Sequence, residues 1–151
     1  MLELGRFCVD PNYRDPKIIM TAWSAIRKLV EKNKIKFLFG CSSFIGTSID
    51  RYLDCFKFLK TKYIAPKKYN LYVKAPKVFK FNNLINLNNF CLKKAKKNLP
   101  PLLSFYLNLG GWVSDHVVID DDLETMHVFT GLEVKEIPEK RLKFLNKINL
   151  N

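Results

Sequence analysis

The chain has 151 residues, of which 48% are hydrophobic, and a formal net charge of +12. This length corresponds to one domain, and a chain of this size can bury a core without disulfides. The composition is ordinary for a globular protein, and the longest apolar run, around residues 99–113, falls short of the ~20 residues that a membrane-spanning helix needs.

The cysteines and the charged N-terminus favour a cytoplasmic protein. Cys8, Cys41, Cys55 and Cys91 form no CxxC pair and no metal-like spacing with the two histidines, so we expect reduced thiols. Residues 1–15 carry charges throughout, which predicts no signal peptide. We expect a cytoplasmic location, with peripheral contact at the inner membrane as an open alternative.

The positive charge is concentrated in the middle of the chain. Twelve lysines and no acidic residues lie between Cys55 and Ser114, whereas fourteen basic and fourteen acidic residues balance one another elsewhere. Such a block suggests an anionic partner: phosphate, nucleic acid, an anionic membrane or an acidic carrier protein. AT-biased coding would explain the lysines equally well, because the chain is also rich in Asn, Ile and Phe.

The first predicted elements form a strand–helix–strand unit. Residues 2–9 alternate as a strand does, and Asp15 with Pro16 suits the start of a helix over residues 16–33. Residues 36–44 (KFLFGCSSF) are almost continuously apolar, as expected for a strand that is covered on both faces. The order of these elements predicts a βαβ crossover.

The middle of the chain predicts short helices and irregular segments. A second helix is expected to be capped by Ser48 or Asp50 and to bury Leu53, Phe56 and Leu59. Residues 69–74 are expected to be extended and residues 75–89 irregular. A short basic helix is predicted over residues 90–97, and a further one from Pro100-Pro101 to Gly110-Gly111.

The last third predicts a hairpin and a helix. Residues 112–119 and 126–134 have strand character and are joined by the acidic turn 120–122, and a helix follows from Pro138 with Leu142, Leu145 and Ile148 inward. We therefore expect a single domain with a βαβ core (1–47), a basic helical insert (48–111), and a hairpin with a terminal helix (112–151).

The segment from the first strand into the first helix is the best candidate site. A strand, a turn and a helix N-terminus in this order often bind an anion, so a phosphate could lie at residues 15–19 beside Arg14 and Lys17. Glu3 could accept a proton from an amine, and Arg6 could hold a carboxylate. A plainly capped helix and structural ion pairs are the alternatives.

Three other clusters are weaker candidates. Cys41 beside Ser42-Ser43 suggests a nucleophile, but no GxSxG or Cys-His pattern accompanies it, so a core thiol is preferred. His116 and His127 lie on the two hairpin strands and could face each other, but a metal site needs more ligands. The turn 120–122 lacks EF-hand spacing and is interpreted as solvated.

Two separated blocks resemble one known family. The first block comprises Glu3-Leu4-Gly5-Arg6, Cys8-Val9, Pro11, Tyr13-Arg14, Phe39-Gly40-Cys41 and Ser43. The second comprises Leu99-Pro100-Pro101-Leu102-Leu103, Tyr106, Leu109-Gly110 and Val118-Ile119-Asp120. In this order the blocks resemble the core motif and the PPLxxxYxxLG helix of the ornithine-acyl carrier protein N-acyltransferases, often labelled hemolysin-like. These enzymes begin ornithine lipid synthesis.

The resemblance implies a fold and an activity. The family belongs to the GCN5-related N-acetyltransferase (GNAT) superfamily, which implies a mixed α/β sheet with flanking helices. The activity would be transfer of a 3-hydroxy fatty acyl group from acyl carrier protein to the α-amine of ornithine or a similar amino acid. Glu3 and Arg6 match catalytic positions, and the residues matched to binding of the acyl-phosphopantetheine donor are Tyr13, Arg14, Asp15, Lys17, Ile18 and Ile19. No metal and no tightly bound cofactor is expected.

The sequence also departs from the family. Residues 12–19 contain no glycine, which favours a carrier-bound donor over coenzyme A, because a loop around a pyrophosphate is usually glycine-rich. Phe7 stands where family members have a small residue, and residues 123–127 lack their polar pattern. The resemblance covers nearly the whole chain but only the C-terminal half to two-thirds of a family member, so we expect the N-terminal strands to be missing. An inactive fragment and a basic module for nucleic acid or anionic lipid stay open; nucleic acid is the less expected partner, because no RNP or KH motif occurs.

Overall fold

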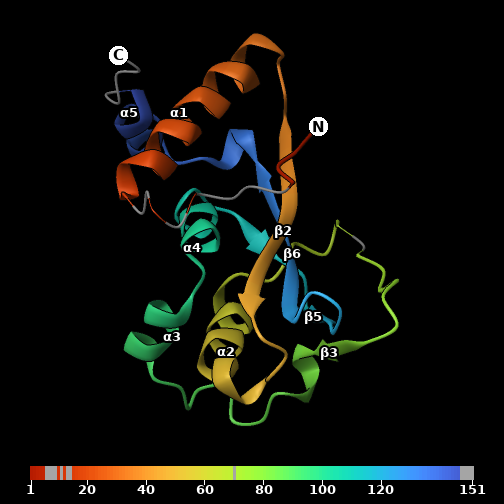
Figure 1. Ribbon diagram of the computed structural model, residues 1–151. Coiled ribbons are helices and arrows are strands. Elements are labelled where there is room, and N and C mark those ends of the chain that lie inside the picture. Colours follow the sequence, from red (N-terminus) through yellow and green to blue (C-terminus); the bar gives the residue numbers. More distant parts are fainter. Residues whose placement is uncertain (6–9, 11, 13–14, 70, 147–151) are drawn as a thin grey trace.

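The computed structural model describes residues 1–5, 10, 12, 15–69 and 71–146, with the backbone alone for residues 16 and 144–146 (Figure 1). The described strands form a six-stranded mixed sheet in the order β1-β2-β6-β5-β3, with β4 paired to β6. They are β1 (Leu2–Glu3), β2 (Phe37–Ile45), β3 (Val78–Lys80), β4 (Trp112–Val113), β5 (His116–Asp120) and β6 (Thr125–Glu133). The expected mixed α/β fold is thereby confirmed.

The chain opens with the predicted βαβ crossover. β1 and β2 are parallel and are connected through α1 (Pro16–Lys32). The Asp15 side chain caps α1 by accepting a hydrogen bond from the Lys17 N–H at 2.8 Å, as an N-cap residue does. The first strand was predicted over residues 2–9; the described strand ends at Glu3, and residues 6–9 lie outside the described part.

All described helices cover the same side of the sheet (Figure 1). Besides α1 they are α2 (Leu53–Lys62), α3 (Leu92–Asn98), α4 (Pro101–Asn108) and α5 (Glu139–Asn146). One part of the core joins α2 and α4 to the sheet around Phe44, Phe56 and Val128. The other part joins α1 and α4 to the sheet around Trp23 and Leu132. The apolar side chains of the helices are therefore buried on one face only.

The sheet is half-covered, which corrects one prediction. We expected residues 36–44 to be covered on both faces, but in β2 burial alternates: Leu38, Ser42 and Phe44 are buried, whereas Cys41 and Ser43 are exposed. The buried set faces the helices. We call the opposite side the open face; it carries the odd-numbered residues of β2 and β6 together with Glu3.

The start of the second helix also differs from the prediction. The turn η1 (Asp50–Tyr52) precedes α2, and its N-cap is Ile49 without a side-chain hydrogen bond, so neither Ser48 nor Asp50 caps the helix. Tertiary contacts fix this start instead, because the Tyr52 hydroxyl donates to the Ile45 carbonyl at 3.0 Å. The predicted buried stripe through Phe56 and Leu59 is confirmed.

The segment between α2 and α3 contains a strand that the sequence did not reveal. Residues 75–89 were expected to be irregular, but β3 pairs antiparallel with β5 and is followed by the turn η2 (Phe81–Asn83). A three-residue strand has too little alternation to be recognised locally. Residues 71–74, expected to be extended, form no strand.

The later elements agree with the sequence except that the strand predicted over residues 112–119 is divided into β4 and β5, which both pair with β6. α3 and α4 occur where two helices were predicted, and β5 and β6 form the predicted hairpin around the acidic turn. The turn η3 (Val134–Glu136) leads from β6 to α5, in which Leu142 is half-buried. No helix in the described ranges is long and apolar enough to cross a membrane.

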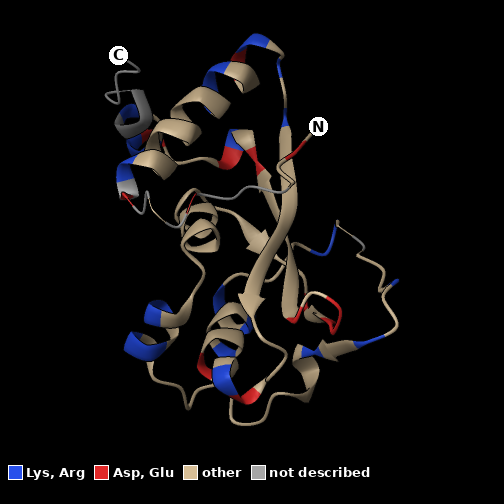
Figure 2. Cartoon of the chain, in the orientation of Figure 1, with Lys and Arg blue, Asp and Glu red and all other residues tan. Residues whose placement is uncertain are grey.

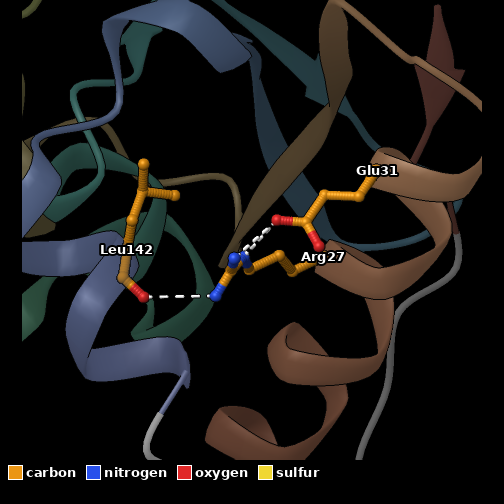
Figure 3. A network of polar contacts seen from close by, with 3 residues as sticks. All are labelled: Arg27, Glu31 and Leu142. Carbon is orange, nitrogen blue, oxygen red and sulfur yellow. Dashed lines mark hydrogen bonds and ion pairs between the residues drawn. The ribbon is translucent and has the colours of Figure 1, made fainter.

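A polar network connects α1 to α5 (Figure 3). The Arg27 guanidinium donates to the Glu31 carboxylate from Nε at 2.9 Å and from Nη2 at 2.5 Å. Its Nη1 donates to the Leu142 carbonyl in α5 at 3.3 Å. These three residues border a cavity of about 50 Å³ that Trp23 and Leu38 also line, so the network closes an apolar gap between the two helices.

We expect Arg27→Met to destabilise the packing of α5 on α1, because it removes the hydrogen bond to the Leu142 carbonyl. Methionine keeps most of the aliphatic stem, so the apolar contacts of this side chain are retained. The expected cost is about 1–2 kcal/mol in the free energy of unfolding. Hydrogen exchange of the amides in Glu139–Asn146 should accelerate in this variant. Glu31→Gln is the control, since it leaves the Arg27–Leu142 bond in place; equal exchange in Arg27→Met and the parent protein would contradict the role of the network.

Candidate active site

The junction of β1 and β2 is held by a close backbone approach. Glu3 lies opposite Phe39, and the Leu4 N–H donates to the Phe39 carbonyl at 2.7 Å. A Cβ atom on Gly40 would lie only 2.6 Å from the Leu4 carbonyl oxygen, so this close approach requires glycine at position 40. Among the described residues the pairing of β1 with β2 ends here, whereas β2 continues to Ile45.

Glu3 is exposed on the open face, in line with Phe39 and next to Cys41. Three other predicted site residues of this segment, Arg6, Tyr13 and Arg14, lie outside the described residues. The position of Glu3 leaves its carboxylate accessible to a substrate on the side of the sheet that the helices do not cover.

The N-terminus of α1 already holds a negative charge. The Asp15 carboxylate accepts from the Lys17 N–H, and the Asp15 carbonyl accepts from the Ile18 N–H at 2.9 Å. Lys17 is exposed, and Ile18 and Ile19 are half-buried. The four predicted binding residues Asp15, Lys17, Ile18 and Ile19 therefore lie in one helical turn. A phosphate at this turn would need free N–H groups, but the Asp15 carboxylate already accepts from one of them.

Cys41 is not the core thiol that we expected. It is exposed on the open face, because odd-numbered residues of β2 point away from the helices. Partial burial raises the pKa of the Cys41 thiol, and the nearby Glu3 carboxylate raises it further. The thiol is therefore protonated at neutral pH, which disfavours a nucleophilic role.

The two histidines do not face each other. His127 is paired with Val118, its Nδ1 lies 2.9 Å from Ser43 Oγ, and its Nε2 lies 2.9 Å from Thr125 Oγ1. His116 is buried and its Nδ1 contacts Asp115 at 2.8 Å. Within the described ranges no group of three or more His, Cys, Asp or Glu residues could hold a metal ion.

An aromatic cluster covers part of the open face, and the sequence analysis missed it. Phe37 stacks on Tyr69 at 5.3 Å between ring centroids, and Trp112 lies 4.6 Å from Tyr69 and 6.0 Å from Phe129. Gly131 makes room for the Trp112 ring, which lies directly over it. The spacing of Phe37 and Phe39 was the available signal, since residues two apart share one face of a strand.

Glu133, at the end of β6, adds a carboxylate to this cluster. Its side chain is only 12% exposed, and it pairs with Lys68 at 2.5 Å and with Lys135 at 3.5 Å. The hydrogen bond from Lys68 lowers the pKa of Glu133, and the same bond raises the pKa of Lys68. No local pattern predicts this ion pair, because Lys68 and Glu133 are far apart in the chain.

Comparison with known proteins identifies relatives that match nearly all of the chain. An L-ornithine N(alpha)-acyltransferase from Rhodobacter capsulatus is 29% identical over 147 residues, which is 97% of this chain and 56% of that protein. Proteins of the same name from Brucella abortus (28%) and Rhizobium meliloti (29%) match 95% of this chain and 51% and 48% of their own lengths. The chain is a distant homologue of the L-ornithine N(alpha)-acyltransferases.

This homology confirms the family resemblance of the sequence motifs. The chain spans about half the length of the ornithine acyltransferases that it matches. Neither a family model nor a solved structure matches it.

Replacing Gly40 by alanine should strain the close approach of the Leu4 backbone to β2, because the new methyl group would meet the Leu4 carbonyl oxygen. The expected destabilisation is about 1–3 kcal/mol, measured by urea unfolding. Gly5→Ala is the matched control, since its Cβ would meet only the flexible Glu3 side chain at 3.3 Å. Equal stability of the two variants would contradict the close approach.

Replacing Glu3 by glutamine should lower the pKa of Cys41, because the negative charge that stabilises the protonated thiol is removed. The rate of Cys41 alkylation by iodoacetamide, followed by peptide mass spectrometry across a pH series, should then rise at lower pH than in the parent protein. Cys91 in the same samples is the internal control. An unchanged profile for Cys41 would place the Glu3 carboxylate away from the thiol.

Proposed function

We propose that the chain carries the acyl-transfer site of an N-acyltransferase that moves a 3-hydroxy fatty acyl group from acyl carrier protein to the α-amine of ornithine. Homology to ornithine acyltransferases over 95–97% of the chain carries this proposal. The parallel β1–β2 pair with its crossover helix, inside a mixed sheet, supports a GNAT-like fold.

Glu3 supplies the base in this proposal. The α-ammonium group must lose a proton before it can attack, and Glu3 is an accessible carboxylate on the open face. The amine nitrogen then bonds to the thioester carbonyl carbon, the carbon–sulfur bond breaks, and the released thiolate takes a proton. Arg6 holds the carboxylate of the acceptor amino acid.

The first turn of α1 receives the phosphate of the donor's phosphopantetheine. Tyr13, Arg14 and Lys17 flank the phosphate, and the N–H groups of Ile18 and Ile19 lie in the same turn. The Asp15 carboxylate then leaves the Lys17 N–H, because two negative charges cannot share the helix N-terminus. The cap and the phosphate are therefore alternatives.

The lysines of α3 offer a surface for the acidic carrier. Lys93, Lys96 and Lys97 are exposed, and Figure 2 shows α3 as a basic helix at the side of the molecule. Lys94 is already paired with Asp54 at 3.6 Å. Complementary charge of this kind accelerates the encounter with an acidic protein and is weakened by salt.

The proposal is tested with 3-hydroxyacyl-acyl carrier protein and L-ornithine, with acyl-ornithine detected by mass spectrometry. Two proteins are compared: this chain, and a chimera in which it replaces the matched segment of the Rhodobacter capsulatus relative. We expect acyl-ornithine from at least one of them, and a ~10²–10⁴-fold lower kcat for its Glu3→Gln variant.

The parental Rhodobacter capsulatus protein is the positive control. Absence of product from both the chain and the chimera would refute the proposed activity. Product formation that Glu3→Gln leaves undiminished would refute the role of Glu3 alone.

A further inference from the structure

The strongest unassigned feature is the way in which the Lys68 ammonium group is held. Its Nζ lies 2.5 Å from Glu133 Oε1 and 5.0 Å from the centre of the Tyr69 ring. A carboxylate together with an aromatic face is a typical receptor for an alkylammonium group. Lys68 itself is 54% exposed, whereas the Glu133 side chain is only 12% exposed. The carboxylate of this receptor is therefore held by the sheet, whereas Lys68 and Tyr69 belong to a surface segment that crosses it.

The surroundings of Glu133 belong to the open face. Phe37 is the register partner of Glu133 and stacks on Tyr69, and Trp112 completes the aromatic wall. Tyr69 also borders a hollow of about 300 Å³ whose lining includes neither Lys68 nor Glu133, so the ammonium site is the position of Lys68 Nζ itself.

We propose that Glu133 and Tyr69 recognise the side-chain ammonium group of the acceptor amino acid, and that Lys68 occupies this site until the acceptor displaces it. The inference rests on the proposed function, whose acceptor carries the same primary alkylammonium group as a lysine side chain. Lys135, 3.5 Å from the other oxygen of Glu133, remains at the rim.

The sheet places this site at a suitable distance from Glu3. Glu3 and Gly131 are the partners of Phe39 on either side of β2, and Glu133 lies two residues beyond Gly131. With strands about 4.8 Å apart and a rise of about 3.4 Å per residue, the Cα atoms of Glu3 and Glu133 are roughly 12 Å apart. Two glutamate side chains that lean toward each other can span this distance with a diamino acid between them.

A purely structural ion pair predicts a different response to mutation. If Lys68 only anchors its segment to the sheet, Lys68→Gln and Glu133→Gln should each weaken that anchor and leave ligand preference unchanged. If Lys68 competes with the acceptor, the two substitutions should act in opposite directions, because one removes the competitor and the other removes the receptor.

The test is isothermal titration calorimetry of the chain with L-ornithine and with L-norvaline, which lacks the side-chain amine. We expect Lys68→Gln to bind ornithine about tenfold more tightly than the parent protein, with norvaline binding unchanged. Glu133→Gln should lose the preference for ornithine. Lys77→Gln is the matched control, since Lys77 pairs with Asp121 at another surface site.

Equal binding of ornithine and norvaline by Lys68→Gln would overturn the inference. The Lys68 side chain is 54% exposed, so its replacement opens no cavity in the core. The measurement uses no acyl donor, so a failure of acyl transfer leaves its result intact. Conversely, acyl transfer to ornithine with the same KM in the parent protein and in Glu133→Gln would overturn the ammonium site and leave the proposed function standing.

Discussion

The antiparallel pairing of β2 with β6 is the constraint on which the rest of the structure depends. It runs through nine residue pairs, from Phe37 opposite Glu133 to Ile45 opposite Thr125. A shift of one residue in this register would move every side chain to the other face. The register therefore decides at once which residues join the core, such as Phe44 and Val128, and which residues lie on the open face.

Because the helices bury only one side of this pair, the open face is available for chemistry. Glu3 enters it from the neighbouring parallel strand, and the close approach of Leu4 over Gly40 fixes where that strand leaves β2. The aromatic cluster around Trp112 shields one end of the face, and the polar contacts of His127 with Ser43 and Thr125 occupy the other. Different chemical environments therefore lie along one rigid surface.

Local signals predicted what depends on neighbouring residues. The Asp15–Pro16 helix start, the β5–β6 hairpin and the apolar stripe of α2 are encoded within short segments and were found. Three features depend instead on residues that are distant in sequence. They are the half-covered state of β2, the strand β3, and the pairing of Lys68 with Glu133. Apolar residues at both odd and even positions of β2 are compatible with a strand that is covered on one face or on both faces. Only the placement of the helices decides which of the two applies. The motif residues Arg6, Tyr13 and Arg14 lie outside the described residues, so their roles stay predictions.

If the proposed function holds, the separation of Glu3 from Glu133 has a consequence for the choice of acceptor. Both residues lie in paired strands, so the sheet sets the distance between the proposed base and the proposed ammonium site. Lys68, by contrast, lies on the connecting segment between α2 and β3, outside the sheet. In this proposal the sheet selects the length of the acceptor, while Lys68, together with Lys135, neutralises the half-buried Glu133 carboxylate when no acceptor is bound. Pairing with Lys68 and Lys135 explains why an acidic side chain can lie beside the aromatic cluster, since an unpaired carboxylate there would be costly.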